Sequence, residues 1–259
     1  MKVAILAGGF GTRLSEETSI RPKPMVEIGG KPILWHIMKM YAHHGFREFI
    51  ILGGYKVEYI KKYFINYRGD CTDYTIDLGT GDIEWLQPTH EDWRVTVLDT
   101  GSDVMTGGRL KRAMRYLCDA PFCLTYGDGV SNVDVAALVR QHQESDSWCT
   151  LTAVVQPGRY GALRVSRDGR HVNGFREKGA TDGGLINGGF FVCNPEVFEL
   201  IEGDQTVWEN DPMERMVEMG KLGYYHHQGF WQSMDSLRDK MLLEELWTTD
   251  PAWKVWKDK

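Results

Sequence analysis

Cysteine is sparse in this sequence and follows no recognisable spacing. The 259 residues include five cysteines, an odd number, and no two of them form a Cys-x-x-Cys pair (Cys71, Cys118, Cys123, Cys149 and Cys193). This pattern argues against a disulfide framework and against a zinc site, and it indicates reduced thiols in a cytoplasmic protein.

Long apolar runs are also missing. The first apolar run, residues 1–7, is too short for the core of a signal peptide, and no later run approaches the roughly 18 apolar residues of a membrane span. We therefore expect a soluble protein with no membrane partner. Hydrophobic residues make up 42% of the chain and charged residues 25%, which is typical of a globular protein and argues against disorder.

A surplus of positive charge is absent as well, because the formal net charge is −6. Such a balance provides no broad surface for nucleic acid, so we expect no nucleic-acid partner. A small polyanionic substrate would need a local cluster of basic residues.

Short buried strands alternate with amphipathic helices through the first half of the chain. We expect strands at 2–7, 49–52, 94–98, 122–126 and 149–155, and helices at 32–44, 57–64, 109–117 and 133–143. This alternation predicts a Rossmann-like, doubly wound and mainly parallel α/β sheet with right-handed crossovers. Residues 67–92 show no clear period and are expected to form an insertion with weak strands.

The second half is richer in short strands. A hairpin is expected from 162–165 and 171–177, and further strands from 185–193, 223–227 and 230–234. Helices are expected at 196–201, 212–219 and 236–247. We interpret this half as a β-rich lid on the α/β sheet within one domain.

The chemistry begins at residues 6–14, which read LAGGFGTRL. Glycines directly after a buried strand let the backbone turn sharply, and successive N–H groups in such a turn form a concavity that binds anions. Arg13 adds a fixed charge with a fork suited to phosphate oxygens. Arg21 and Lys23 follow in RPKP at 21–24, so the loop and its cations could neutralise most of a triphosphate.

The sequence does not match two other glycine-loop motifs, the dinucleotide fingerprint and the Walker loop. A dinucleotide fingerprint would need a third glycine where Leu14 stands, and the second strand ends in Gly53-Gly54 instead of an acidic residue. A Walker loop would need Gly-Lys-Ser/Thr, which is absent from the sequence. A plain strand-to-helix turn with incidental cations remains the alternative.

The whole string, LAGGFGTRL followed by RPKP, resembles the signature of the sugar-1-phosphate nucleotidyltransferase family. Residues 125–129 (TYGDG) resemble its metal-binding strand end, 175–178 (FREK) its sugar-phosphate motif, 186–191 (INGGFF) its sugar-hydroxyl segment, and 229–235 (GFWQSMD) the strand that supplies a second metal ligand. Two positions depart from the family pattern: Gly179 replaces a usual proline, and Asn132 stands where an acid is expected. We expect a surface position or a minor effect for Asn132.

The resemblance implies the nucleotide-diphospho-sugar transferase fold. Residues 1–155 would be the nucleotide-binding half, 156–235 the sugar-phosphate-binding half with the sugar-binding lid, and 236–259 a C-terminal helical segment available for oligomer contacts. A homo-oligomer is implied, with a hexamer as one candidate state.

Within the family, TGGR at 106–109, YGDGV at 126–130 and the tryptophan-rich C-terminus resemble the members that use CTP and glucose 1-phosphate. The implied products are CDP-glucose and pyrophosphate, which feed dideoxysugar synthesis for bacterial surface polysaccharides such as the lipopolysaccharide O-antigen. Members that use dTTP, UTP or GTP are the alternatives, and so is a non-catalytic nucleotide-sensing homologue. The last should lack some of the charged residues that are all present here.

The resemblance also implies roles for individual residues. The nucleotide-binding residues would be Leu6, Ala7, Gly8, Gly9, Gly11, Thr12, Arg13, Lys23, Arg109, Gly127 and Asp128, with Arg109 at the start of a helix. The substrate-binding residues would be Glu177, Lys178, Asn187, Gly188 and Trp231. Arg13, Lys23 and Lys178 would be catalytic through charge neutralisation, because a sugar phosphate is already a nucleophile and needs no general base.

Asp128 and Asp235 are the candidate ligands of one Mg²⁺, which accepts two carboxylates and fills its other positions with water and phosphate oxygens. A turn aspartate at Gly-Asp-Gly and a helix cap are their respective structural alternatives. Paired histidines at 43–44 and 226–227 lack metal-ligand spacing and are expected to be structural. Trp247, Trp253 and Trp256 are expected in packing or in a subunit interface, not in base stacking.

Overall fold

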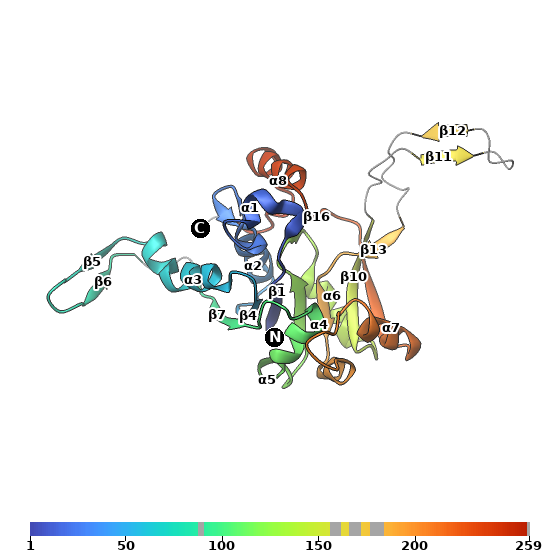
Figure 1. Cartoon of the computed structure of the whole chain (residues 1–259), viewed down its shortest axis with the longest axis horizontal. Coiled ribbons are helices and arrows are strands. Elements are labelled where there is room, and N and C mark those ends of the chain that lie inside the picture. The colour runs from blue at the N-terminus through green and yellow to red at the C-terminus, as the bar shows by residue number, and fades with distance from the viewer. Residues whose placement is uncertain (88–90, 156–161, 166–171, 177–183, 258–259) are drawn as a thin grey trace.

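A mixed sheet of eight strands forms the centre of the molecule (Figure 1). The structure is a computed structural model that describes residues 1–87, 91–155, 162–165, 172–176 and 184–257, with 162–165 and 172–176 described as backbone only. The parallel half of the sheet has the spatial order β7 (Arg94–Asp99), β4 (Glu48–Gly53), β1 (Val3–Ala7) and β8 (Phe122–Tyr126). The sheet continues from β8 through antiparallel β14 (Phe191–Cys193) to β10 (Cys149–Val155), which also pairs with β13 (Leu185–Asn187) and β15 (Leu222–His227).

Helices cover both faces of this sheet. The longer ones are α2 (Ile33–His43), α3 (Val57–Cys71), α4 (Thr106–Arg112), α6 (Val135–Gln143), α7 (Asp211–Glu218) and α8 (Leu237–Thr249). The shorter ones are η1 (Thr12–Leu14), α1 (Ser15–Thr18), η2 (Lys23–Met25), α5 (Met114–Leu117) and η3 (Pro195–Leu200). Small two-stranded ladders complete the fold: β2 (Glu27–Ile28) with β3 (Lys31–Pro32), β5 (Tyr74–Ile76) with β6 (Ile83–Trp85), β9 (Gly129–Ser131) with β16 (Trp231–Ser233), and β11 (Ala162–Val165) with β12 (Val172–Arg176).

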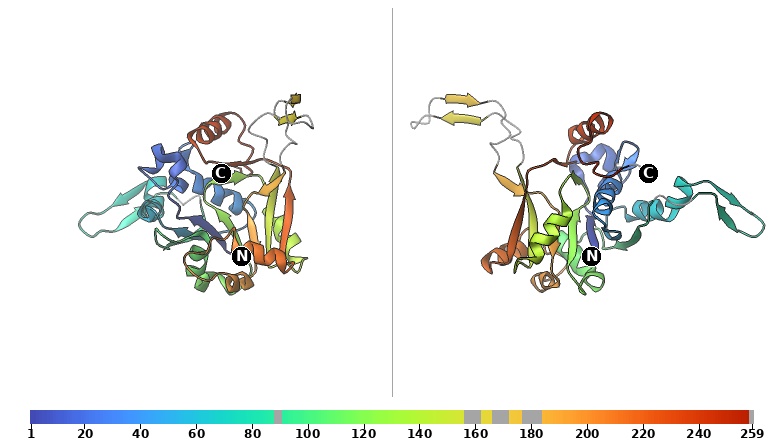
Figure 2. Two further views of the ribbon diagram at one scale, coloured as in Figure 1. Left: turned by 45° about the vertical axis from the view of Figure 1, so that its right-hand side comes forward. Right: turned by 180° about the vertical axis from the view of Figure 1, so that it is seen from behind.

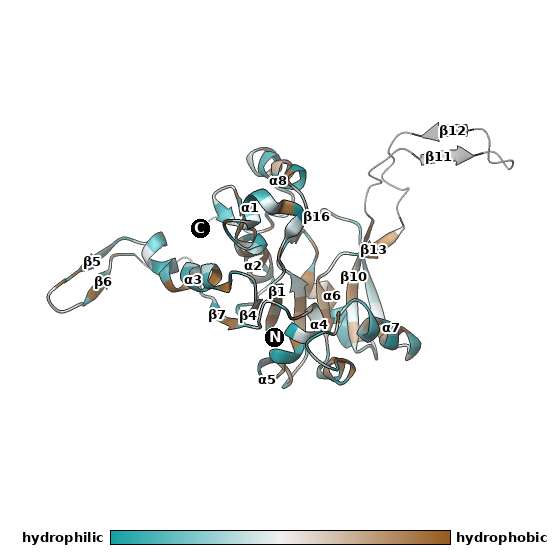
Figure 3. Cartoon of the chain, viewed as in Figure 1, coloured by the Kyte–Doolittle hydropathy of each residue, from teal (hydrophilic) through white to brown (hydrophobic). Residues whose placement is uncertain are grey.

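The residues of β1 explain why it is an interior strand of the sheet. All five are buried, and they alternate between two hydrophobic clusters because successive side chains of a strand point to opposite faces. Val3 and Ile5 face the cluster built around α2, and Ala4 and Leu6 face the cluster under α4 and α7. Figure 3 accordingly shows hydrophobic colours concentrated on the central strands.

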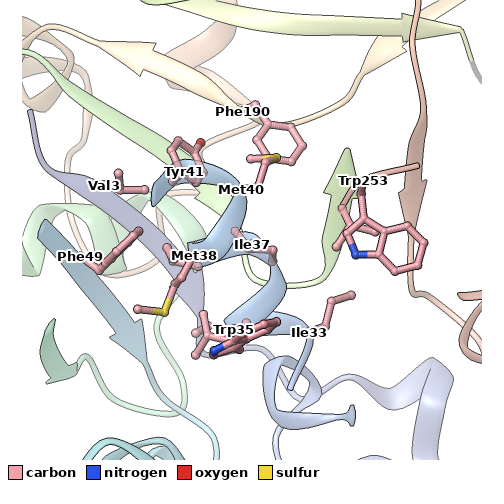
Figure 4. Packing of buried hydrophobic residues seen from close by; sticks show 14 of the residues in the cluster. Val3, Ile33, Trp35, Ile37, Met38, Met40, Tyr41, Phe49, Phe190 and Trp253 are labelled. Atoms are coloured by element: carbon pink, nitrogen blue, oxygen red, sulfur yellow. The ribbon is translucent and has the colours of Figure 1, made fainter. Parts of the chain in front are cut away.

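The α2 cluster contains the C-terminal tryptophans. Trp253 and Trp256 are 1% and 7% exposed and pack with Trp35 around His36, as the close view of this core shows for Trp35 and Trp253 (Figure 4). Burial lowers the pKa of His36 to about 4, so this histidine is a neutral core residue at physiological pH. The packing interpretation of Trp253 and Trp256 is confirmed.

Most expected elements form where the sequence placed them, with four differences. The helix expected at 57–64 continues to Cys71 as α3, and residues 195–200 form a 3-10 helix. The helix expected at 109–117 begins at Thr106 and is divided into α4 and α5. The strand expected at 185–193 is split into β13 and β14, because the backbone turns through Gly189 at φ +75° and Phe190 at φ +48°.

Two hairpins lie at opposite ends of the molecule, β5–β6 beyond the end of α3 and β11–β12 on the side of β13 (Figures 1 and 2). The β5–β6 hairpin continues α3 and confirms the expected insertion with weak strands. The backbone of β11 and β12 forms the expected antiparallel hairpin of the β-rich half. No helix within the described ranges has the length and apolar character needed to cross a bilayer.

Asn132 does not lie at the surface as expected. Its side-chain Oδ1 is enclosed, with no hydrogen-bond partner among the described residues, next to the β9–β16 ladder.

Replacing Trp253 with alanine should lower the free energy of unfolding by about 3–5 kcal/mol, because it removes a buried aromatic side chain from the α2 cluster. Denaturant unfolding followed by circular dichroism measures this change. Ile65→Ala is the control, since Ile65 is 81% exposed and its truncation should change stability little. Equal effects of the two substitutions would contradict the packing role of Trp253.

Candidate active site

A pocket of about 600 Å³ opens at the carboxyl end of β1, where the glycine loop leaves the sheet. Ligands of open α/β sheets bind at this edge, beyond the carboxyl ends of the parallel strands. All the residues predicted to bind nucleotide line the pocket: Leu6, Ala7, Gly8, Gly9, Gly11, Thr12, Arg13, Lys23, Arg109, Gly127 and Asp128. The structure thus brings together residues from four separate stretches of the chain.

The glycines of the loop serve different steric purposes. A Cβ on Gly8 would lie 2.2 Å from Nη1 of Arg109, so any larger residue there would displace this guanidinium. Gly11 has φ +63°, a left-handed conformation that glycine adopts without strain. A Cβ on Gly9 would meet no atom within 4 Å. The protein itself therefore sets no steric requirement for glycine at position 9.

The guanidinium of Arg109 holds this loop in place. Its Nη2 donates to the carbonyl oxygens of Gly8 at 3.0 Å and Ser102 at 3.2 Å, and its Nη1 donates to Gly101 O at 2.6 Å and Thr100 Oγ1 at 2.8 Å. Arg109 is 4% exposed and lies inside α4, so the expected place at the start of a helix is wrong. The structure shows a buried arginine that fixes the backbone under the pocket.

Lys23 lies between the two predicted metal ligands. Its Nζ donates to Asp128 Oδ2 at 2.6 Å and to Asp235 Oδ1 at 2.9 Å. Arg13, whose side chain is 78% exposed, approaches the same Asp235 oxygen at 3.4 Å. Two carboxylates therefore converge on one point of positive charge.

The β9–β16 ladder explains how these distant carboxylates meet. Gly129 pairs with Ser233, and the N–H of Met234 donates to the carbonyl oxygen of Asp128 at 2.8 Å. Asp128 precedes one strand of the ladder and Asp235 follows the other, so antiparallel pairing places both at the same end. Ser236, not Asp235, caps α8, which removes the helix-cap alternative for Asp235.

The electrostatics of the cluster favour the ionised forms. Burial acts to lower the pKa of Lys23, but the charges of Asp128 and Asp235 and the hydrogen bonds to them outweigh burial and raise it. Burial acts to raise the pKa of Asp235, whereas its hydrogen bond to Lys23, the charge of Lys23 and the hydrogen bond from Ser233 lower it.

A second pocket of about 220 Å³ adjoins the first. Tyr126, Asp128 and Asp235 line both pockets and form their common boundary. Asn187, Gly188 and Trp231, predicted to bind sugar phosphate, line the second pocket, and Trp231 Nε1 donates to Gly188 O at 2.7 Å. Glu177 and Lys178, predicted for the same site, lie outside the described residues.

The arrangement is a larger pocket beside the glycine loop, a smaller pocket next to it, and a charged cluster where the two meet. The sequence profile of the nucleotidyl transferase family matches residues 2–258 of the chain. A glucose-1-phosphate cytidylyltransferase of Salmonella typhimurium is 52% identical over 99% of this chain and 100% of its own length.

The chain belongs to the nucleotidyl transferase family. This nucleotidyl transferase is also 32% identical to a D-glycero-alpha-D-manno-heptose 1-phosphate guanylyltransferase of Aneurinibacillus thermoaerophilus, over 83% of this chain and 84% of that protein. A solved structure of a UDP-glucose pyrophosphorylase from Acinetobacter baumanii superposes with a TM-score of 0.70 at 15% identity, covering 97% of this chain and 95% of that one. The latter similarity shows the nucleotide-diphospho-sugar transferase fold.

Sequence reasoning missed several residues of the nucleotidyl transferase site. Tyr126 belongs to both pockets, and one rim of the larger pocket is formed by Ser102, Asp103, Val104, Met105, Thr106 and Gln205. Residues 102–105 follow the carboxyl end of β7, so the strand-end rule that selected Asp128 could have indicated them too. Gln205 carries no comparable signal in the sequence.

Lys23→Met should reduce the loss of folding stability that this nucleotidyl transferase shows at alkaline pH. The pKa of Lys23 is higher in the folded chain than its ordinary value of 10.5. The contribution of Lys23 to the free energy of unfolding is therefore complete below pH 10.5, and it is lost as the pH rises through the pKa of the folded state.

Thermal unfolding between about pH 8 and pH 12 tests this expectation, since lysines titrate in that range. The melting temperature should fall more steeply with rising pH in the wild type than in Lys23→Met. Lys62→Met, which changes an exposed lysine on α3, should keep the wild-type slope. Identical alkaline slopes for all three proteins would show that the cluster does not hold the proton of Lys23.

Proposed function

We propose that this nucleotidyl transferase transfers a cytidylyl group from CTP to α-D-glucose 1-phosphate, giving CDP-glucose and pyrophosphate. The observation that supports this reaction is the junction of two pockets at Asp128, Asp235 and Lys23. A triphosphate in the larger pocket and a sugar phosphate in the smaller one would present their reacting phosphates at that junction. The choice of CTP and glucose rests on the Salmonella typhimurium relative, which is similar over the full length.

The reaction is an in-line displacement at the α-phosphorus. An oxygen of the sugar phosphate forms a new bond to this phosphorus while the bond to the β-phosphate oxygen breaks, and that electron pair leaves with pyrophosphate. The sugar phosphate carries the required negative charge, so the main obstacle is repulsion between two polyanions. Catalysis then consists of positioning and charge neutralisation.

The glycine loop, the charged cluster and the residues predicted for the sugar phosphate would supply both the positioning and the charge neutralisation. The N–H groups of the glycine loop and Arg13 would bind the triphosphate, and Lys23 would neutralise charge beside the α-phosphate. We include Lys178 as the cation for the sugar phosphate, and Glu177 and Asn187 as partners for sugar hydroxyls. Trp231 would support the smaller pocket through its hydrogen bond to Gly188.

Magnesium is part of the proposal, with Asp128 and Asp235 as its ligands. These residues fit a cation, because both carboxylates already converge on the ammonium of Lys23 in this structure. Two carboxylates suit Mg²⁺, which keeps water and phosphate oxygens in its remaining positions. When bound, Mg²⁺ would offset the negative charge of the triphosphate and the leaving pyrophosphate.

A guanylyltransferase is the second candidate, because the heptose 1-phosphate guanylyltransferase is 32% identical to this chain. Release of pyrophosphate from CTP, dTTP, UTP and GTP, each with glucose 1-phosphate and with a mannose-type sugar 1-phosphate, separates these functions. We expect the highest kcat/KM with CTP and glucose 1-phosphate. A preference for GTP would overturn the proposed substrate, and dependence on added magnesium tests the metal.

Lys23→Ala and Asp128→Ala should each reduce turnover by about 10²–10³-fold, because each removes a contact to charge that develops during transfer. Lys62→Ala is the control. Circular dichroism should show folded protein in all cases. Near-normal turnover in either variant would remove that residue from the mechanism.

We also propose that the enzyme acts in the cytoplasm as a homo-oligomer, a hexamer being the state implied by the resemblance, and that its product serves O-antigen synthesis. The β5–β6 hairpin supports association, because Ile76, Leu78 and Ile83 are 44%, 88% and 46% exposed on an element that extends from the sheet (Figure 1). Exposed apolar residues gathered on one element indicate a contact surface.

Light scattering tests the oligomer. Leu78→Asp together with Ile83→Asp should yield a smaller particle than the wild type, whereas Ile65→Asp, on α3, should not. A monomeric wild-type protein would contradict the proposal.

A further inference from the structure

Tyr126 forms the wall between the two pockets, at the point where β8 ends. No role was expected for it from the sequence. Its hydroxyl group makes polar contacts on two sides, and those contacts determine which way its hydrogen points.

On one side the phenol is fixed by Glu209. Tyr126 Oη donates to Glu209 Oε1 at 2.5 Å. The other carboxylate oxygen, Oε2, accepts a hydrogen bond from Thr106 Oγ1 at 2.8 Å, and Thr106 Oγ1 accepts from the N–H of Trp208 at 2.9 Å. Trp208 is fully buried, so this chain of contacts anchors Glu209 in the core.

On the other side the phenol oxygen faces residues of the smaller pocket. Asn187 Nδ2 lies 3.4 Å from Tyr126 Oη as a donor, and Asn187 Oδ1 accepts from the N–H of Gly189 at 2.9 Å. Asn187 is therefore oriented with its NH₂ group toward the phenol. Both residues line the smaller pocket.

A phenol has one hydrogen to donate and lone pairs with which to accept. The hydrogen of Tyr126 is directed to Glu209, so the phenol presents only an acceptor to the smaller pocket. The matching substrate group is a hydrogen-bond donor.

We propose that Tyr126 determines sugar specificity by accepting a hydrogen bond from one hydroxyl of the sugar phosphate, and that Glu209 is the positioning residue that turns the phenol into an acceptor. The inference rests on the proposed function, because it assigns this hydroxyl to the sugar 1-phosphate. It adds a contact between two segments, β8 and the loop before α7: Tyr126 lies within the TYGDG motif but had no role assigned to it, and Glu209 lies in none of the motifs described above.

The test compares wild type and Tyr126→Phe on glucose 1-phosphate and on its 2-, 3-, 4- and 6-deoxy analogues, at saturating CTP. The wild type should lose about 5- to 10-fold in kcat/KM with one analogue, as expected for the loss of one uncharged hydrogen bond. Tyr126→Phe should show a similar loss with glucose 1-phosphate, and no additional loss with that same analogue. Such non-additivity identifies a direct contact.

The corresponding deoxyfluoro analogue sharpens the result, because fluorine can accept but cannot donate a hydrogen bond. It should be as poor a substrate as the deoxy analogue for the wild type. Glu209→Gln, which places an amide N–H near the hydroxyls of Tyr126 and Thr106, should weaken discrimination between glucose 1-phosphate and the analogue. The KM for CTP should stay unchanged in both variants.

Tyr59→Phe is the matched control, since it removes the hydroxyl of an exposed tyrosine on α3. It should behave as wild type with every sugar. Equal additional losses of Tyr126→Phe with all analogues, or a change confined to the KM for CTP, would overturn the inference. A wild-type enzyme that does not use CTP and glucose 1-phosphate would instead overturn the proposed function, so the two failures are distinguishable.

Discussion

The ammonium group of Lys23, held between Asp128 and Asp235, is the contact on which the rest of the site depends. Without a cation at this point, two carboxylates would face each other at the junction of the two pockets. Lys23 balances them in the ligand-free chain, and a divalent ion together with the triphosphate would change that balance. The ammonium group of Lys23 therefore has to neutralise both carboxylates in the ligand-free chain and to exchange them for other partners when ligands bind.

Two features of the fold hold this cluster in position. The β9–β16 ladder fixes the two aspartates at one end of a small sheet, although they are separated by more than a hundred residues. Arg109 ties the glycine loop to the end of β4 and to the loop after β7 through backbone oxygens. The positions of the charged side chains in the pocket thus depend on hydrogen bonds of the backbone, in the β9–β16 ladder and around Arg109.

Much of this could be predicted from the sequence, because the signals were local. Buried strands such as β1 and β8 have an apolar pattern, and the glycine loop and the Asp128 turn follow them directly. The break at Gly189 and Phe190 could not be foreseen, since it results from the way β13 and β14 both pair with β10. The same holds for Tyr126 and Glu209, which meet only through tertiary packing.

Arg109 illustrates the limit in another way. The motif placed it near the nucleotide, and it does line the pocket, but the sequence could not show that its donors are directed to carbonyl oxygens. Only the packing of α4 against the loops reveals that arrangement.

The contacts of Arg109 have a consequence for the diversity of this scaffold. Arg109 donates hydrogen bonds to the main-chain oxygens of Gly8, Gly101 and Ser102. The side chains on the neighbouring rim of the pocket take no part in these three hydrogen bonds. Substitution of Asp103 or Met105 would therefore leave these hydrogen bonds in place. The lining of this rim can vary while the glycine loop keeps its position.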